Sequence, residues 1–507
     1  MSIQQRKNDL TNRRAHIELG GGKDAIGKLH AKGKLTARER ISRLLDENSF
    51  VEVGAFVTSR VKDFDLGSKN PPADGVVTGF GTVRGRLVYV YSQDATVLGG
   101  ALGEMHGKKI GALYDMALKM GAPVVGFLDS AGLRLQETSY GLEGFGAIYQ
   151  KQSQASGVLP QITAVMGNCG GGSAVITSLS DFTFMTEKNA HLFVNSPNTL
   201  DDRHATMDKY ASAKFHGETT GIVDFVCKDE AGLIEDMVRL LDMLPSNNRE
   251  EAYSGSTTDD LNREDWEIVD LVGEGMDGRQ MAAMIADNHQ VVEVKALYGQ
   301  EVVTAFVKMN GNTVGLVGSQ SAGGAGRIGR DGCDKIADFV RFCDAFNIPL
   351  VTLVDVEGFE ATVEQEQKAV SKAIADMTAA FVGASVPKVD VLVHRAYGSA
   401  YVSLNSKHVG ADIVLAWPSA TMSVMDPKAA VRIMYAEELA ASKDARALQE
   451  EKAAEYAKQQ ASPYAAAERG FVDDIIEPQA TRKHVIYTLE MLRTKRAEGL
   501  DKKHNTI

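Results

Sequence analysis

The 507-residue chain contains an internal duplication, because its second half repeats residues of its first half at a constant offset of 226 positions. The matching pairs are Asp129 and Asp355, Pro123 and Pro349, Gly103 and Gly329, Lys109 and Lys335, and Ile110 and Ile336. The offset becomes 227 further on, where Pro160 matches Pro387 and Gly171 matches Gly398, as one inserted loop residue would cause. A repeat of this length is far longer than the periods of solenoid proteins. We therefore predict a duplicated domain.

The same order of elements is expected in both halves: an apolar strand, a glycine-rich turn, a helix and a second apolar strand. The apolar faces of the two helices correspond at i, i+3, i+6 spacing. These positions are Ile110, Leu113 and Met116 in the first half, and Ile336, Phe339 and Phe342 in the second. The strands VVGFLD and LVTLVD are continuously apolar, as in a covered, mostly parallel sheet. The sequence therefore predicts an α/β fold with two tandem domains.

A change in composition marks the expected domain boundary. Between about Pro245 and Asp265 the apolar periodicity is lost and Asn, Gly, Ser and Asp gather, which is typical of a linker. We place the two domains at residues 1–250 and 265–507. An Ala-, Glu- and Lys-rich stretch from about Glu437 to Gln460 predicts one surface helix.

The overall composition excludes several classes of protein. With 44% hydrophobic and 24% charged residues, the chain has the composition of a soluble globular protein. No apolar run approaches the roughly 18 residues of a membrane helix, and the first residues lack the apolar core of a signal peptide, so a cytoplasmic protein is expected. The net charge of -12 disfavours nucleic acid as a partner. The four cysteines form no CxxC pair and the histidines lack zinc-hydrolase spacing, so we expect free thiols and assign no metal.

The most unusual local sequence is GNCGGGSA, which covers residues 167–174 after an apolar strand. Consecutive glycines allow positive φ angles and leave backbone N–H groups uncovered by side chains. Such groups can stabilise an oxyanion. A tight turn between strand and helix is the plainer interpretation of one such segment. The corresponding segment RAYGSAY, residues 395–401, appears at the equivalent place of the second half, and this recurrence favours a functional role.

Other motifs give weaker evidence of function. The segment GGALGEMHGKK has Leu102 where a P-loop needs its first glycine, so we reject a Walker motif. The glycine-rich residues 318–332 match a loop of the first half and are interpreted as a repeated loop. Asp129 and Asp355 lie at the ends of strands. An Asp at such a position caps the next helix or turn at least as often as it serves in catalysis. Cys169 has no visible His partner and is interpreted as a buried thiol.

Several long segments resemble a known family. They include KGKLTARER, DGVVTGFGTVRGRLVYVYSQD, GALGEMHGKKI, ADFVRFCDAFNIPL and AERGFVDDIIEP. In these segments the chain resembles the carboxyltransferase subunits of biotin-dependent acyl-CoA carboxylases and decarboxylases, such as the propionyl-CoA carboxylase β chain and the methylmalonyl-CoA decarboxylase α chain. The resemblance spans nearly the whole chain. It implies two domains of the ClpP/crotonase superfamily, a homo-hexamer, and an active site at a dimer interface.

The resemblance also implies a site and a reaction. The backbone N–H groups of Gly171 and Gly172 would hold the thioester oxygen of an acyl-CoA in the N-terminal domain, and those of Ser399 and Ala400 the ureido oxygen of biotin in the C-terminal domain. Substrate-binding positions are implied at Gly132, Gly170, Gly398, Tyr401 and Val402. The expected reaction moves a carboxyl group between carboxybiotin and the α-carbon of a short-chain acyl-CoA through an enolate, without a protein base. It carboxylates propionyl- or acetyl-CoA, or decarboxylates methylmalonyl- or glutaconyl-CoA.

The expected partners follow from what the sequence lacks. No AMKM biotinylation sequence is present, so the resemblance implies a separate biotin carboxyl carrier protein, with biotin carboxylase or membrane decarboxylase subunits as further partners.

The chain departs from the family pattern at a few positions. Ser399 replaces a glycine, and its N–H group serves as a donor only if its φ angle is negative. Glu357, Glu360 and Glu364 add negative charge near the expected entrance for carboxybiotin. Two alternatives therefore stay open: a non-catalytic assembly paralogue, and a biotin-independent crotonase-type hydratase or isomerase with Glu357 as base.

Overall fold

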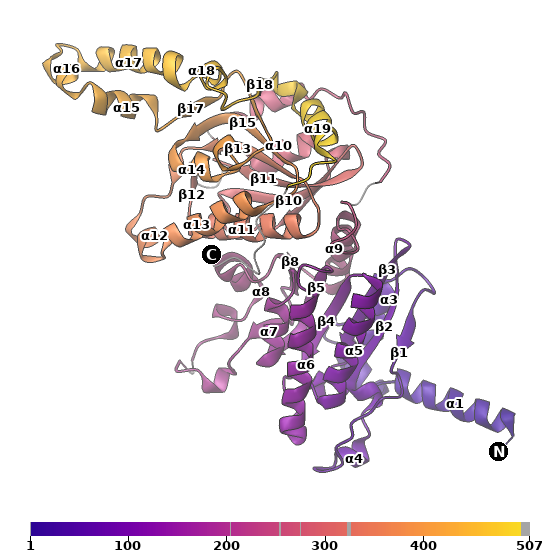
Figure 1. The fold of residues 1–507 in the computed structure, drawn as a ribbon. Coiled ribbons are helices and arrows are strands. Elements are labelled where there is room, and N and C mark those ends of the chain that lie inside the picture. Colours follow the sequence, from indigo (N-terminus) through magenta and orange to yellow (C-terminus); the bar gives the residue numbers. More distant parts are fainter. Residues whose placement is uncertain (1, 203, 253–254, 274, 322–325, 498–507) are drawn as a thin grey trace. The chain divides into compact units, whose positions relative to one another are not determined.

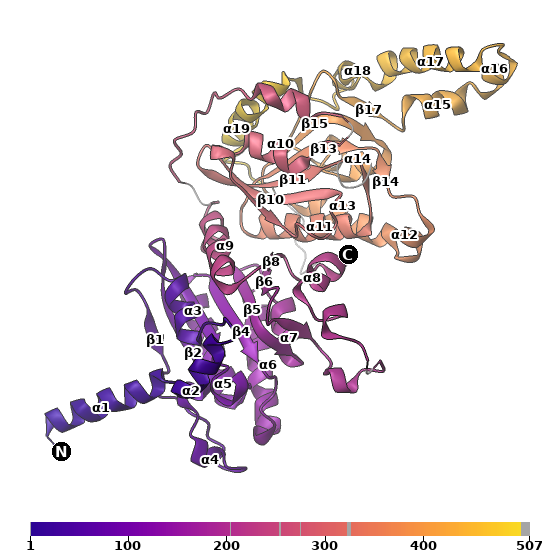
Figure 2. The ribbon, with the colours of Figure 1, turned by 180° about the vertical axis from the view of Figure 1, so that it is seen from behind.

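The computed structural model describes the whole chain except residues 1, 203, 253–254, 274, 322–325 and 498–507. The chain divides into two compact units, Met1–Glu250 and Glu251–Ile507, shown from opposite sides in Figures 1 and 2. Among the described residues, each unit is built on one mixed sheet of eight strands. No helix in these described parts is both long enough and apolar enough to cross a membrane.

The sheet of the first unit has the order β1-β2-β3-β4-β5-β6-β8, and β7 pairs with β5. Its strands are β1 (Val51–Val53), β2 (Val76–Val83), β3 (Arg86–Gln93), β4 (Val124–Ser130), β5 (Gln161–Gly170), β6 (Phe182–Thr186), β7 (His191–Phe193) and β8 (Phe225–Cys227). The first three strands are antiparallel, and from β3 onward neighbouring strands are parallel. This arrangement brings the carboxyl ends of the parallel strands to one edge of the sheet.

The helices of the first unit are α1 (Ile3–Glu18), α2 (Lys23–His30), α3 (Ala37–Leu44), α4 (Leu66–Lys69), α5 (Glu104–Met120), α6 (Ser139–Ala155), α7 (Gly172–Ser178), α8 (Ala213–Phe215) and α9 (Glu230–Met243). Helices α5 and α6 pack side by side, and α3 packs against α9 (Figure 1). The predicted apolar face of α5 is in the core, since Ile110 and Leu113 are fully buried.

The second sheet repeats this topology strand for strand. Its order is β9-β10-β11-β13-β15-β16-β18, and β17 pairs with β15. Its strands are β9 (Val291–Val294), β10 (Val302–Met309), β11 (Asn312–Ser319), β13 (Leu350–Val356), β15 (Lys388–Tyr397), β16 (Ile413–Ala416), β17 (Thr421–Ser423) and β18 (Asp474–Ile475). A separate pair joins β12 (Arg327–Ile328) and β14 (Gly358–Phe359). The predicted α/β fold with two similar halves is confirmed.

The helices of the second unit are α10 (Gly278–Ile285), α11 (Arg330–Ala345), α12 (Val363–Gln367), α13 (Val370–Gly383), α14 (Gly398–Ser403), α15 (Pro427–Met434), α16 (Ala436–Ala441), α17 (Ala445–Tyr456), α18 (Pro463–Glu468) and α19 (Thr481–Leu492). Helices α15, α16 and α17 form an arm at the edge of this unit (Figure 1). The prediction of one helix from Glu437 to Gln460 is wrong. The chain breaks after α16 because Asp444 caps a new helix, its carboxylate accepting the Ala447 N–H at 3.0 Å.

The paired lysines of the duplication have one structural role. Lys109 donates to the carbonyl oxygens of Ala73, at 2.8 Å, and Val76, and Lys335 donates to those of Tyr298 and Val302, at 2.9 and 2.8 Å. Burial lowers the pKa of each lysine to about 8. The repeated lysine therefore ties equivalent backbone segments to the helix that carries it.

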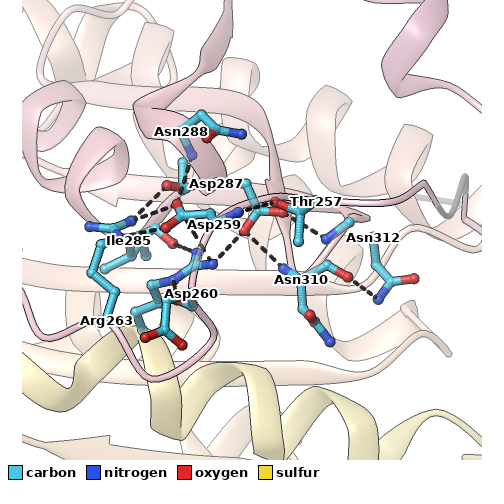
Figure 3. Close-up of polar contacts among 12 residues, drawn as sticks. Thr257, Asp259, Asp260, Arg263, Ile285, Asp287, Asn288, Asn310 and Asn312 are labelled. Carbon is cyan, nitrogen blue, oxygen red and sulfur yellow. Dashed lines mark hydrogen bonds and ion pairs between the residues drawn. The ribbon is translucent and has the colours of Figure 1, made fainter.

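The segment Thr257 to Asp265 is fixed to the second unit by a network of charges (Figure 3). Arg263 bonds Asp259 at 3.0 Å, and the N–H of Asn288 donates to Asp259 at 2.8 Å. The buried Arg482 pairs with Asp287 at 2.5 Å. The two units divide within the range predicted for the boundary, and the part of it from Thr257 onward is tied to the second unit because Asp259 pairs with Arg263 and with the buried Arg482.

Candidate active site

A glycine turn follows the long strand at the centre of each sheet. Strand β5 leads through Gly171 into α7, and β15 leads through Gly398 into α14. The two glycines have φ angles of 59° and 60°, which L side chains rarely adopt. At Gly398 a β carbon would also lie 3.0 Å from the carbonyl oxygen of Val424. The backbone therefore requires glycine at these two equivalent positions.

The N–H group of Gly171 is occupied. It donates to the carbonyl oxygen of Phe193 at 3.0 Å, next to the pairing of β5 with β7. The expectation that this group is free to hold a substrate oxygen is therefore wrong. Gly172 and Ser173 begin α7, where N–H groups have no partner within the helix. These two residues lie one position further along the chain than the predicted pair.

The repeat itself contains the signal for this correction. At the offset of 227, Ser399 and Ala400 correspond to Gly172 and Ser173, not to Gly171 and Gly172. Ser173 was thus missed by the sequence prediction, although the alignment of the two halves identifies it.

The first turn of α14 consists of Gly398, Ser399 and Ala400. Ser399 is exposed, lies within the helix and does not have a positive φ angle. Its N–H group can therefore serve as a donor although serine replaces glycine at this position. Ala400 is buried. The amides of both residues lie in the helix turn that lacks internal acceptors.

Helical periodicity places Tyr401 and Val402 on different faces of α14. Val402 is 38% exposed and shares the outer face of α14 with Ser399, whereas Tyr401 is only 3% exposed. The ring of Tyr401 packs edge-on against that of His408, with 6.2 Å between centroids. The prediction that Tyr401 binds substrate is therefore wrong for its side chain, because the helix turns it into the core of the second unit.

Gly132 and Gly170 come together in the first unit. A β carbon on Gly132 would lie 3.7 Å from the carbonyl oxygen of Gly170, and Gly132 has a φ of 97°. The N–H of Gly132 donates to the hydroxyl of Ser130 at 3.1 Å. A β carbon on Gly170 would lie 2.7 Å from the ring of Phe193. Both glycines therefore allow close packing of the chain around the β5 turn.

The two repeated aspartates are buried and paired with cations. Asp129 contacts Lys34 at 2.6 Å and Arg40 at 3.0 Å. Asp355 contacts Arg395 at 2.7 Å. Burial raises the pKa of Asp355, but its contacts with His394 and Arg395 outweigh burial and hold this pKa below its usual range. Asp355 is therefore a poor proton acceptor, and the ion pairs of both aspartates serve the structure.

The glutamates near the second turn are compensated as well. Glu357 contacts Arg327 at 2.8 Å and Arg395 at 3.3 Å. Glu364 pairs with Lys368 at 2.6 Å. The negative charge predicted from the sequence is therefore largely neutralised by neighbouring cations.

Thiol and metal chemistry find no support in the described residues. All four cysteines are buried there as free thiols, and burial raises the pKa of Cys169. The interpretation of Cys169 as a buried thiol is confirmed. In the same described parts, no three His, Cys, Asp or Glu side chains are grouped so as to hold a metal ion.

Comparison with known proteins defines the family. A model of the carboxyl transferase domain matches residues 28–507. The chain belongs to the carboxyl transferase family. This carboxyltransferase is 42% identical to the methylmalonyl-CoA decarboxylase subunit alpha of Propionigenium modestum over 100% of both chains. It is 40% identical to the propionyl-CoA carboxylase beta chain of Roseobacter denitrificans over 98% of both.

A solved structure agrees with this assignment. The transcarboxylase 12S crystal structure, described as a hexamer assembly with methylmalonyl-coenzyme A and methylmalonic acid bound, matches the carboxyltransferase with a TM-score of 0.96 and 40% identity, over 100% of this chain and 98% of that one. The family predicted from the sequence is confirmed. The protein is an enzyme of the biotin-dependent acyl-CoA carboxylase and decarboxylase family.

Proposed function

We propose that this subunit moves a carboxyl group between carboxybiotin, carried by a separate biotin carboxyl carrier protein, and the α-carbon of a short-chain acyl-CoA. The observation that carries the proposal is the repeated turn, in which Gly172 and Ser173 correspond to Ser399 and Ala400. Each turn offers two backbone donors after the long parallel strand of its sheet. We assign the acyl-CoA to the first unit and biotin to the second, both as crotonase-type domains.

The chemistry needs donors for two oxygens that gain negative charge. The N–H groups of Gly172 and Ser173 stabilise the thioester oxygen as the enolate forms, and those of Ser399 and Ala400 stabilise the ureido oxygen. Carboxybiotin, when bound, would supply the carboxyl group as carbon dioxide, and the biotin anion left behind would accept the α-proton. The exposed apolar Val402, on the same face of α14 as Ser399, suits the apolar ring system of biotin. No protein base is needed, in agreement with the ion-paired state of Asp129 and Asp355.

The acyl group and direction are part of the proposal. The relatives include a methylmalonyl-CoA decarboxylase subunit and a propionyl-CoA carboxylase chain, so we propose propionyl-CoA and methylmalonyl-CoA as the first substrates to test, with acetyl-CoA and glutaconyl-CoA next. A homo-hexamer is proposed from the hexamer assembly of the transcarboxylase 12S relative. Biotin carboxylase or membrane decarboxylase subunits are the further partners.

The direct test is carboxyl transfer by the purified subunit. It is incubated with carboxylated biocytin and each acyl-CoA, and in reverse with biocytin and each carboxylated acyl-CoA, and labelled carboxyl transfer is measured. We expect transfer with at least one pair. Normal acyl-CoA binding without transfer in either direction, also in the reconstituted complex, would contradict the proposal and support an assembly subunit. Hydration or isomerisation that avidin does not inhibit would support the biotin-independent alternative.

A further inference from the structure

A group of buried polar side chains lies beneath α14. It consists of Thr352, Asp390, Tyr401 and Asn405, and is called here the Asp390 cluster. Thr352 and Asp390 face each other across β13 and β15, and the Thr352 hydroxyl donates to Asp390. The side-chain amide of Asn405 donates to the Thr352 hydroxyl oxygen and to the Val389 carbonyl oxygen, both at 3.3 Å.

Asp390 differs from the repeated acids Asp129 and Asp355 in having no cation beside it. It is fully buried, and no Lys, Arg or His in the described parts of the chain forms an ion pair with it, whereas Asp129 pairs with Lys34 and Arg40 and Asp355 pairs with Arg395. An ionised carboxylate buried without a cation is strongly disfavoured. Burial raises the pKa of Asp390 well above its usual range. Burial without a counter-charge therefore favours the neutral carboxylic acid at this position.

A neutral acid also explains the hydrogen bonding of the cluster. Three buried atoms have no partner among the described residues: Oδ2 of Asp390, the hydroxyl of Tyr401 and Oδ1 of Asn405. With an ionised Asp390, two of these three would be pure acceptors and only the hydroxyl of Tyr401 could donate. A proton on Asp390 adds the missing donor. Tyr401 is near enough for Asp390 to raise its pKa further, after the larger effect of burial.

Asn405 bonds the cluster to the chain just after α14, whereas the hydroxyl of Tyr401 has no hydrogen-bond partner among the described residues. Tyr401 belongs to this six-residue helix, and Asn405 follows its last turn in a left-handed conformation with a φ of 52°. So short a helix is not stable by itself and depends on its packing. Its first turn carries Ser399 and Ala400. Contacts that fix Asn405 therefore fix the direction of these two amides.

The first unit lacks this cluster at the same place in its sheet. Gly126 and Thr163 occupy the register positions of Thr352 and Asp390. Tyr91 fills the space over Gly126, because a β carbon there would lie 2.2 Å from the Tyr91 ring. The buried acid is therefore particular to the second unit.

We propose that Asp390, as a neutral acid, is a positioning residue for the biotin side of the reaction. Its hydrogen bond with Thr352, which in turn accepts from Asn405, ties the C-terminal end of α14 to the sheet and thereby holds the N–H groups of Ser399 and Ala400 toward the ureido oxygen. This inference rests on the proposed function.

The kinetic test compares Asp390→Asn with Asp390→Ala in the full-length protein. Asn keeps the size, the neutrality and a donor, so we expect the KM for carboxylated biocytin to stay within about twofold of wild type. Ala removes the hydrogen bonds, so this KM should rise by about tenfold or more, with the KM for the acyl-CoA unchanged. The matched control is Thr163→Ala in the first sheet, which should leave the KM for biocytin unchanged. Equal losses on both substrates, or an Asn variant as impaired as Ala, would overturn the proposal.

Two measurements test the role of Asp390 without an activity assay. The infrared difference spectrum of wild type and Asp390→Asn at neutral pH should contain the C=O band of a protonated carboxylic acid. Hydrogen exchange of the peptide covering α14 should become faster in Asp390→Ala and stay as in wild type in Asp390→Asn. Absence of the acid band, or unchanged exchange in the Ala variant, contradicts the inference. Failure of the wild type to transfer a carboxyl group would instead contradict the proposed function.

Discussion

Asp181 and Asp412 occupy equivalent places in the two sheets, yet among the described residues only Asp412 forms an ion pair with a cation. The N–H of Asp181 donates to the Gln161 carbonyl oxygen at 2.9 Å, and its carboxylate accepts the Gln161 N–H at 2.7 Å. Asp412 makes the same two bonds with Lys388, at 2.9 and 2.8 Å. Asp412 also pairs with Lys495 at 2.8 Å. In the first unit, burial and the nearby Asp224 raise the pKa of Asp181 to about 7.

This comparison separates what a duplicated fold keeps from what it varies. Backbone hydrogen bonds, the register of the strands and the positive φ angles of Gly171 and Gly398 recur in both units. The side chains beside equivalent acids differ, as Asp181 and Asp412 show. Backbone geometry therefore sets the two turns, and the side chains around them are free to differ between the units.

The largest effect is expected from removing one donor in the second turn only. Proline at Ser399 deletes the N–H group, and proline is tolerated in the first turn of a helix. We expect Ser399→Pro to lower kcat for carboxyl transfer by about 10²–10³-fold, as loss of an oxyanion donor does. The measurement is labelled carboxyl transfer at saturating acyl-CoA. Acyl-CoA binding, measured by calorimetry, should be unchanged.

The matched control is Ser399→Gly, which keeps the N–H group. Its activity should be close to that of wild type. A proline variant with full activity would remove the second turn from the mechanism and leave the comparison with the first turn without functional meaning.

The next effect concerns the buried ion pairs of the first unit. Arg40 is nearly fully buried and bonds both Glu230, at 2.7 Å, and Asp129, at 3.0 Å. Arg40→Met leaves two buried acids with less compensation, so the free energy of unfolding should fall by about 3–5 kcal/mol. Denaturant unfolding followed by fluorescence measures this loss. Arg395→Met should cost less, because Arg395 is partly exposed and His394 remains 3.2 Å from Asp355.

Much of the fold could be predicted from sequence, because matching strands and turns at one offset define two similar sheets. The donor residues proposed here differ by one position from the sequence prediction in the first half and are the same in the second half. The error at Gly171 arose because strand β7, which occupies its N–H group, is separate in sequence from the GNCGGGSA segment. The cations beside Asp129 and Asp355 were not predicted, since Lys34 and Arg40 lie about ninety residues from Asp129 in the chain. Tertiary contacts of this kind have no local signal.

A smaller effect should depend on pH. Because the folded pKa of Asp181 is about 7 and its usual value is 3.8, the folded state holds this proton more tightly than the unfolded state. Stability should therefore fall as pH rises from about 4 to 7 and stay low above that. Asp181→Asn is neutral at every pH and still accepts the Gln161 N–H. It should be more stable than wild type at pH 8, by about 2–4 °C in Tm for each kcal/mol regained, with no gain near pH 4.

Asp412→Asn is the matched change in the second unit. It removes the partner of Lys495, so it should lower the Tm at pH 8. Equal responses of the two variants would contradict the view that the units differ in how they compensate buried acids.

The smallest effect is expected at Glu357, and it decides between the proposed reaction and its biotin-independent alternative. Its carboxylate already contacts Arg327 and Arg395 at 2.8 and 3.3 Å, and about a third of the side chain is exposed to solvent. Ion pairs of this kind contribute about 0–1 kcal/mol, so Glu357→Gln should change unfolding little. Carboxyl transfer should persist, since the backbone amides and not a carboxylate stabilise the enolate. A variant that loses all turnover while folding normally would show that Glu357 is a base, and the equivalence of the two donor turns would then no longer explain the reaction.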